Sequence, residues 1–373
     1  MQRRLLLTLP AALLHGAGRP IGTALQAAVG PKGVPGAVAM VASSNEITFQ
    51  GAYGNVAMDT IFRIHSMTKP VTSVAAMQLV EKGELHLDDP IEKYLPELAK
   101  LKVLTGFDAN KKPTLTPARR QPTIRQLLSH TAGFGYTSWD ANLAQYGGGE
   151  PPLLFEPGTK WQYGTNVDVI GRVVERLSKQ TLEQYFQANI FAPLNMRETT
   201  FTPSQALQQR LAARGVRQPD GTWKEEKVPM PAKITPNGGG GLVSTAADYV
   251  KFMQMFLKGN KTVLKPESIA AMRKNQIGAL SIRKMVSTNQ TLTRDFGFHL
   301  EAHDKFGLGF QINETPYKGG RAAGSLAWAG FWNTFFWIDP KSNLCAVMLM
   351  QTAPFFDEPS IAALEAFEKA VYQ

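Results

Sequence analysis

The sequence contains a single cysteine, Cys345, among its 373 residues. One cysteine excludes a disulfide within the chain, so nothing in the sequence indicates an oxidising compartment. Cys345 lies in the apolar run 344–350, without a neighbouring charge to stabilise a thiolate, and we expect a buried structural thiol. No apolar run is long enough to cross a bilayer, so no integral membrane segment is expected.

Several catalytic patterns are missing as well. No Gly-x-Ser-x-Gly elbow occurs, which argues against an α/β-hydrolase. His299 and His303 are four residues apart, but Glu301 is not where a zinc-binding His-Glu-x-x-His helix needs it, and no metal is expected. The glycine run 238–241 lacks a following Gly-Lys-Ser/Thr, so we expect a tight turn there and no cofactor.

Basic residues are in excess, with 40 Lys and Arg against 30 Asp and Glu and a formal net charge of +10. A face that binds nucleic acid would concentrate this excess. Here it is spread along the chain in short clusters such as Lys111-Lys112 and Arg119-Arg120. We therefore expect a solvated basic surface and no nucleic-acid partner.

The first 16 residues fit two descriptions. Arg3-Arg4 followed by the mostly apolar stretch 5–14 resembles a short export signal. Pro10 and the lack of a clear cleavage site favour instead the start of a helix that continues towards Gly30. Both interpretations stay open, and with them a cytoplasmic or a periplasmic location.

The remaining chain shows strands near both ends and helices between them. A chain of this length exceeds what one core usually organises, so two lobes are expected. Apolar runs separated by turns predict hairpins over 36–54 and 334–350. Apolar periodicity predicts helices over 68–82, 124–129, 167–178, 182–190, 246–257 and 360–372.

This order predicts an α+β fold, in which helices flank one antiparallel sheet built from both termini and a helical lobe is inserted. We expect 17–90 and 235–373 to form the sheet domain and 91–234 to form a mainly helical domain. A cleft between such lobes is a usual place for a small-molecule site.

Ser66-Met67-Thr68-Lys69 is a Ser-x-x-Lys motif at a predicted helix start. Pro70 fits only the first turn of a helix, which fixes that start close to Ser66. Residues three apart share a helix face, and the helix N-terminus offers N–H groups to an oxyanion. The pattern alone is weak, since Ser66 could equally be an N-cap. Ser281 to Lys284 repeats it without a comparable apolar helix, and we interpret that copy as surface.

Two distant segments add to this motif: the turn 157–166, which contains Tyr163, and Trp328-Ala329-Gly330. Together the three resemble the active-site elements of the serine β-lactamase and penicillin-binding-protein superfamily. Within it the chain is most similar to the class C β-lactamase-like branch, especially the family VIII carboxylesterases. The resemblance includes further segments at 34–36, 62–70, 83–90, 94–96, 127–133 and 238–245.

The resemblance implies a β-lactamase/transpeptidase-like fold and a role for each motif. Ser66 would be the nucleophile, and Tyr163 would accept its proton and later protonate the leaving group, while Lys69 tunes both. Lysine and tyrosine have ordinary pKa values of about 10.4 and 10, so a base drawn from this pair needs a lowered pKa. The sequence leaves the division of these roles open.

The third motif implies contacts to the substrate. The backbone N–H groups of Ser66 and of the Gly330-Phe331 region would form the oxyanion hole, and Trp328 would contact the substrate. Phe134, Tyr136 and Trp139 would line an acyl pocket or simply pack.

Two departures from the class C pattern bear on the substrate. Tyr-x-Asn is replaced, because Thr165 occupies the third position and Asn166 follows one residue late. Lys-Thr-Gly is replaced by Trp328-Ala329-Gly330, so no lysine is present there to attract a carboxylate.

We therefore expect a serine carboxylesterase for short-chain neutral esters. The alternatives are a class C-like β-lactamase acting on β-lactams, a D-alanyl-D-alanine peptidase, a related acyltransferase, or a silent penicillin-recognising protein. Nothing in the sequence indicates an oligomeric state.

Overall fold

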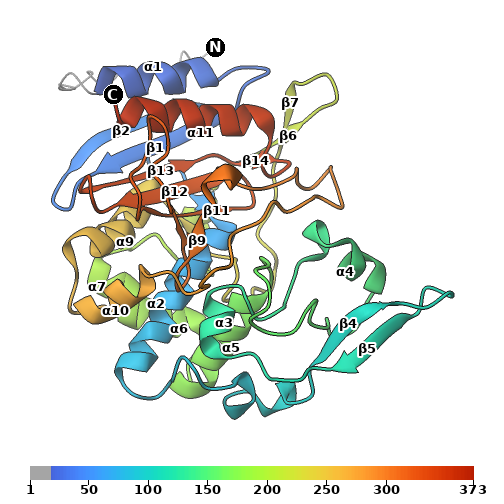
Figure 1. The fold of residues 1–373 in the computed structure, drawn as a ribbon. Helices are drawn as coiled ribbons and strands as arrows, with labels where there is room; N and C mark the ends of the chain where they lie inside the picture. Colours follow the sequence, from blue (N-terminus) through green and yellow to red (C-terminus); the bar gives the residue numbers. More distant parts are fainter. Residues whose placement is uncertain (1–17) are drawn as a thin grey trace.

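A seven-stranded antiparallel sheet organises the computed structural model, which describes residues 18–373 (Figure 1). The predicted signal or helix start in residues 1–16 lies outside the described residues. The strand order is β2-β1-β13-β12-β11-β10-β9. In chain order these strands are β1 (Gly36–Ala42), β2 (Ile47–Gly54), β9 (Lys305–Phe306), β10 (Gln311–Ile312), β11 (Leu326–Gly330), β12 (Thr334–Asp339) and β13 (Leu344–Leu349).

Both ends of the chain contribute to the centre of this sheet. β1 pairs with β2 on one side and with β13 on the other, so that Val38 faces Leu349 and Ala42 faces Cys345. Every residue of β1 is buried, as expected for an apolar strand covered on both faces. The predicted α+β fold, with one antiparallel sheet built from both termini, is confirmed.

Helices cover both faces of the sheet (Figure 1). On one face, α1 (Gly18–Ala28) and α11 (Glu358–Val371) pack against each other, and α1 also contacts β2. On the other face, α9 (Ala246–Lys258) packs against β1, β12 and β13. Cys345 is buried beneath this layer, and burial raises the pKa of its thiol to about 12, as expected for a structural cysteine.

The helix α2 (Thr68–Glu81) connects the sheet to a second group of helices. All its residues from Thr68 to Leu79 are buried, and α5 (Asn166–Ser178) and α6 (Leu182–Phe186) pack against it. A helix that is enclosed all round lies in the core. Its N-terminus, with the Ser-x-x-Lys motif, is therefore held at the centre of the molecule.

The helices predicted from periodicity are present with ends shifted by a few residues, and the remaining elements are short. The helices whose bounds have not yet been given are α3 (Ile124–Leu128), α4 (Ala141–Tyr146), α7 (Ala192–Leu194), α8 (Gln205–Gln208) and α10 (Pro266–Met272). The remaining strands are β3 (Phe62–Arg63), β4 (Lys102–Phe107), β5 (Pro113–Pro117), β6 (Arg214–Arg217), β7 (Trp223–Glu226), β8 (Val243–Ser244) and β14 (Thr352–Ala353).

The hairpin β4–β5, which projects from the body in Figure 1, and the small sheet β14-β6-β7 were not predicted. Most of the β5 and β7 residues are partly or fully exposed. Strands with so little buried surface have no apolar alternation for a sequence pattern to detect.

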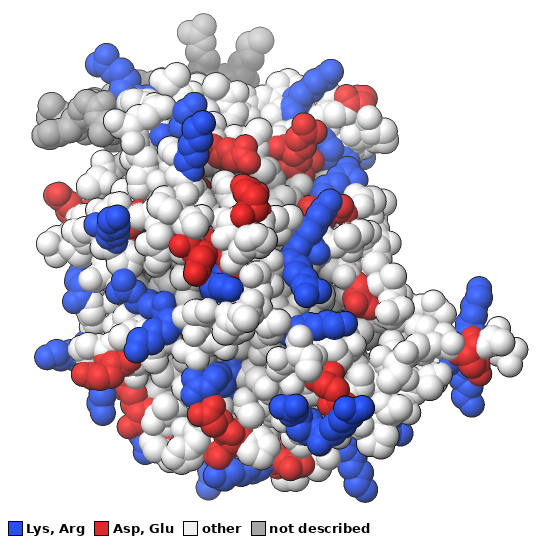
Figure 2. Space-filling view, in the orientation of Figure 1, with Lys and Arg blue, Asp and Glu red and all other residues white. Residues whose placement is uncertain are grey.

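Charged side chains of both signs are interspersed over the face seen in Figure 2. This view agrees with the expected solvated basic surface, since it has no dense basic patch. Within residues 18–373, no helix combines the length and the apolar character needed to cross a membrane.

Candidate active site

Ser66 lies in a single 3₁₀ turn, His65–Met67, between β3 and α2. His65 has φ +43°, a left-handed value that is uncommon outside glycine, and the chain reverses there to begin the helix. The end of β11 packs directly against this turn. A Cβ on Gly330 would lie 2.3 Å from the carbonyl oxygen of Ile64, so only glycine allows the strand to approach so closely.

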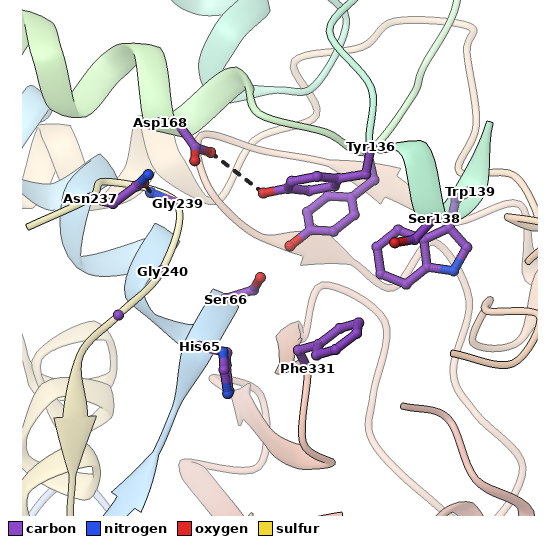
Figure 3. Close-up of a pocket in the computed structure, with 12 residues that line it drawn as sticks. His65, Ser66, Tyr136, Ser138, Trp139, Asp168, Asn237, Gly239, Gly240 and Phe331 are labelled. Atoms are coloured by element: carbon purple, nitrogen blue, oxygen red, sulfur yellow. Dashed lines mark hydrogen bonds between the residues drawn. The ribbon is translucent and has the colours of Figure 1, made fainter. Parts of the chain in front are cut away.

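A cavity of about 320 Å³ opens beside Ser66, and we call it the outer cavity (Figure 3). Its wall combines the Ser66 turn with segments far apart in the sequence, namely 136–139, 163–168, 237–241 and Phe331. The wall contains the carboxylate of Asp168 and no lysine or arginine among the described residues.

Lys69 lies beneath this wall with only 1% of its surface exposed. Its amine donates hydrogen bonds to the carbonyl of Gly239 at 2.6 Å, to the hydroxyl of Tyr136 at 3.1 Å and to Ser66 Oγ at 3.2 Å. An ammonium has three N–H donors, and all three are used here. The contacts are those of a cation whose charge is directed at the serine hydroxyl.

The pKa of Lys69 supports this assignment. Burial by itself lowers the pKa, but the phenolic groups of Tyr136 and Tyr163 and the carboxylate of Asp168 outweigh burial, and the net pKa is raised. The lowered pKa that a base drawn from this pair requires is therefore not found at Lys69, because its neighbours stabilise the charged form.

Tyr136 is a member of the site that sequence reasoning treated only as a pocket or packing residue. Besides accepting from Lys69, its hydroxyl lies 3.5 Å from Oδ2 of Asp168, as Figure 3 shows. Burial raises the pKa of Tyr136, so this phenol stays protonated. Asp168 lies in the first turn of α5, where the helix N-terminus stabilises a carboxylate. No local pattern marks Tyr136, which reaches Lys69 only through the tertiary fold.

Tyr163 is brought to the same place from the turn before α5. Its ring centre lies 5.0 Å from the amine of Lys69, and the residue lines the outer cavity together with Ser66. The hydroxyl of Tyr163 is buried and has no hydrogen-bond partner among residues 18–373. The three predicted catalytic residues thus lie together, with a phenolic oxygen left free for a substrate or a water molecule.

Of the residues predicted to contact the substrate, some line the outer cavity and others do not. Phe331 lines the outer cavity, directly after Gly330 at the end of β11. Trp328 is 2% exposed and lies behind Tyr163, with ring centres 4.8 Å apart. It is absent from the outer cavity, and it borders a smaller apolar space next to Ser66, which we call the inner niche.

The altered Tyr-x-Asn motif also has a structural explanation. Asn166 is fully buried, and its side-chain amide lies 3.1 Å from the carbonyl of Phe134 and 3.0 Å from Nδ1 of His130. It therefore joins the loop 129–136 to the start of α5 and is not part of the cavity wall. Tyr136 and Asp168 line the cavity together with Tyr163.

The glycine run 238–241 and the second Ser-x-x-Lys copy, Ser281 to Lys284, have different places in the structure. Gly239, in the predicted turn, presents its carbonyl to Lys69, and a Cβ there would lie 2.0 Å from Oδ2 of Asp168. The second Ser-x-x-Lys copy has no helix, and its Lys284 is half exposed and pairs with Asp295 at 2.9 Å. It is a surface segment, as expected.

Known proteins match this chain over most of its length. The sequence profile of the family described as Beta-lactamase matches residues 22–369. The chain is 31% identical to lovastatin esterase of Penicillium rubens, over 85% of this chain and 86% of that protein. It is 29% identical to monacolin J acid methylbutanoyltransferase of Aspergillus terreus, over 94% of each.

A structural comparison gives the same grouping. Unliganded simvastatin synthase of Aspergillus terreus superposes with a TM-score of 0.83 at 28% identity, covering 96% of this chain and 98% of that one. The chain thus shares its fold and most of its length with a family whose named relatives include an esterase and acyltransferases. It belongs to the Beta-lactamase family, within the serine β-lactamase and penicillin-binding-protein superfamily.

Proposed function

We propose that this protein is a serine carboxylesterase that hydrolyses neutral esters of short-chain acids through an acyl-enzyme on Ser66. One observation carries the proposal: the Ser66 hydroxyl lies 3.2 Å from a fully hydrogen-bonded Lys69 ammonium, at a cavity whose described wall has no cationic side chain. The named esterase among its relatives supports this substrate class.

Acylation begins with attack by Ser66 Oγ on the ester carbonyl carbon. Because the Lys69 amine already carries its proton, the serine proton passes to the phenolate form of Tyr163, whose oxygen has no hydrogen-bond partner within residues 18–373. The ammonium of Lys69, 5.0 Å from the ring centre, stabilises the negative charge that makes Tyr163 a base. The backbone N–H groups of Ser66 and Phe331 stabilise the oxyanion.

The second half of the reaction returns the proton. Tyr163 protonates the alkoxide as the bond between the carbonyl carbon and the alcohol oxygen breaks, and the alcohol leaves through the outer cavity. A water molecule then enters by the same route, gives its proton to Tyr163 and attacks the acyl carbon. Breakage of the bond to Oγ returns the proton to Ser66 and releases the acid.

The charge of the outer cavity favours a neutral substrate. A β-lactam or a peptide C-terminus carries a carboxylate, which needs a positively charged partner. The outer cavity presents Asp168 instead, and Lys69 is occupied by its three hydrogen bonds. A β-lactamase or a D-alanyl-D-alanine peptidase is therefore the weaker candidate.

The test is hydrolysis of p-nitrophenyl acetate by the whole protein. Ser66→Ala is expected to abolish turnover above the uncatalysed rate, while Ser281→Ala in the second Ser-x-x-Lys copy keeps the wild-type rate. Intact-mass analysis during turnover is expected to show one acetyl group, which peptide mapping locates on Ser66. Turnover that survives in Ser66→Ala would rule out the proposed mechanism.

A second candidate is acyl transfer to an alcohol, and the named methylbutanoyltransferase among the relatives favours it. The chemistry is unchanged except that an alcohol replaces water in deacylation. Adding a primary alcohol to the ester assay separates the two. Transfer predicts a new ester and faster release of p-nitrophenol when deacylation is limiting, whereas a strict hydrolase forms acid alone.

A further inference from the structure

The inner niche is a second space at Ser66 that the catalytic machinery does not fill. It is lined by Ser66 and Tyr163, and otherwise by six apolar or aromatic residues: Trp139, Phe296, Trp328, Ala329, Phe331 and Phe355. Its volume is about 10 Å³, close to the minimum that holds one water-sized group. Ser66, Tyr163, Trp139 and Phe331 also line the outer cavity, so the two spaces meet at the nucleophile.

The back of the niche is a closed aromatic wall. The ring of Phe355 is stacked on Phe331 with centres 5.9 Å apart, and it contacts Phe296 at 5.0 Å and Trp139 at 5.9 Å. The indole N–H of Trp139 is used by a hydrogen bond to Thr293, so it adds no free polar group.

The backbone of Phe355 is held in place as well. Its N–H donates to the carbonyl of Leu292 at 3.0 Å, and its carbonyl accepts from the N–H of Arg294 at 2.8 Å. Phe355 is 3% exposed and packs on the rings of Trp139, Phe296 and Phe331. Its side chain therefore cannot move away from the niche without breaking these contacts.

The two spaces have different uses in an acyl transfer at Ser66. The leaving alcohol has to depart, and the water or acceptor alcohol has to arrive, by the same path, so both need the larger outer cavity. The acyl chain stays bound to Oγ through both steps and needs only a closed apolar site.

Resting on the proposed function, we infer that the inner niche is the acyl subsite and that Phe355 sets the length of the acyl group. The niche fits acetyl with little change, and each methylene beyond its capacity has to displace a packed ring. A longer acyl chain is therefore rejected at the back wall, whereas the niche places no limit on the length of the alcohol half of the ester.

Two matched ester series test the assignment. The first varies the acyl group in p-nitrophenyl acetate, butyrate and hexanoate, and the second varies the alcohol in ethyl, butyl and hexyl acetate. In the acyl series, wild-type kcat/KM is expected to fall by about ten-fold or more for each methylene that exceeds the capacity of the inner niche. It is expected to change much less in the alcohol series.

Phe355→Ala is expected to raise the ratio of hexanoate to acetate kcat/KM by at least about ten-fold and to leave the alcohol series unchanged. Phe355→Leu makes a smaller change in the same direction and serves if the alanine variant does not fold. Phe256→Leu, which alters a buried phenylalanine in α9 away from the niche, controls for general loosening and is expected to keep the wild-type ratio.

The outcomes are distinguishable. A shift of the alcohol series in place of the acyl series, or no shift of either in a folded Phe355 variant, overturns the subsite while ester hydrolysis stands. Absence of Ser66-dependent hydrolysis in the wild type overturns the proposed function, and the subsite with it.

Discussion

The hydroxyl of Tyr136 and the amine of Lys69 lie 3.1 Å apart, and the same amine lies 3.2 Å from Oγ of the nucleophile Ser66. Tyr136 thus holds one of the three ammonium protons, and its own proton points towards Asp168. The relationship makes Tyr136 a positioning residue for the lysine. The lysine is in turn an electrostatic partner of Ser66 and of Tyr163.

Tyr136→Phe removes this acceptor and leaves the ring in place. A hydrogen bond to a charged group contributes about 1.5–3 kcal/mol, so kcat/KM for p-nitrophenyl acetate is expected to fall roughly ten- to hundred-fold. The pH profile of kcat/KM should also move, because Lys69 loses a partner of its charged form. Tyr146→Phe, at the C-terminal end of α4, is the control. An unchanged rate and profile in Tyr136→Phe would contradict this role.

The charge of Lys69 can be measured directly. Since the neighbouring groups raise its pKa, Lys69 is expected to remain protonated up to at least about pH 10.4. A titration of ¹⁵N-lysine-labelled protein by NMR, with Lys69→Met identifying the signal, reports this. A transition near neutral pH would instead make Lys69 the neutral base and return Tyr163 to an accessory role.

Gly330→Ala tests the close contact between β11 and the Ser66 turn. The added Cβ would lie 2.3 Å from the carbonyl oxygen of Ile64 and 2.2 Å from Oγ1 of Thr334, so strand and turn have to separate. A shift of the oxyanion donors is expected to lower kcat by about 10²-fold or more. In Gly240→Ala the nearest atom is 3.7 Å away, so thermal stability should be retained. Wild-type kcat in Gly330→Ala would show that the contact is not needed.

The buried ion pair of Arg321 and Glu368 predicts an acid-dependent stability. Burial raises the pKa of Glu368, but Arg321 outweighs it and the net pKa is lowered. A carboxyl group whose pKa is lower in the folded state than in the unfolded state stabilises the protein at pH values above the unfolded-state pKa of about 4.3. This stabilisation is lost as the pH falls through the folded-state pKa. Urea unfolding of the wild type should therefore show this contribution intact at pH 7 and lost on acidification below about pH 4.3.

Arg321→Met leaves Glu368 buried without its partner and is expected to cost about 3–5 kcal/mol at pH 7. The penalty should shrink towards pH 5, because the isolated carboxyl group becomes protonated. Arg172→Met, which breaks a pair about half exposed on both sides, should change the stability by less than about 1 kcal/mol. Equal losses of stability from the two substitutions would show that burial does not determine how much an ion pair contributes to stability.

Local constraints explain why much of the fold was predictable. Pro70 can occupy only the first turn of a helix, so it located the start of α2 within a few residues. The apolar strands β1 and β13 are buried, and their composition shows it. The hairpin β4–β5 has a weaker signal, because β5 has no buried residue and only Val103 and Leu104 of β4 are buried, so no core selects the pattern of the other side chains.

By itself, the sequence determined the α+β fold, the helix start beneath Ser66 and the alignment of Ser66 with Lys69, because these depend on neighbours within a few residues. Only the tertiary structure decided the surroundings of Lys69, since the groups that raise its pKa come from residues 136, 163 and 168 and the carbonyl that it bonds comes from residue 239. It also placed Trp328 behind Tyr163 and closed the inner niche with Phe355. Charge and cavity shape depend on distances in space, which the order of residues along the chain does not specify.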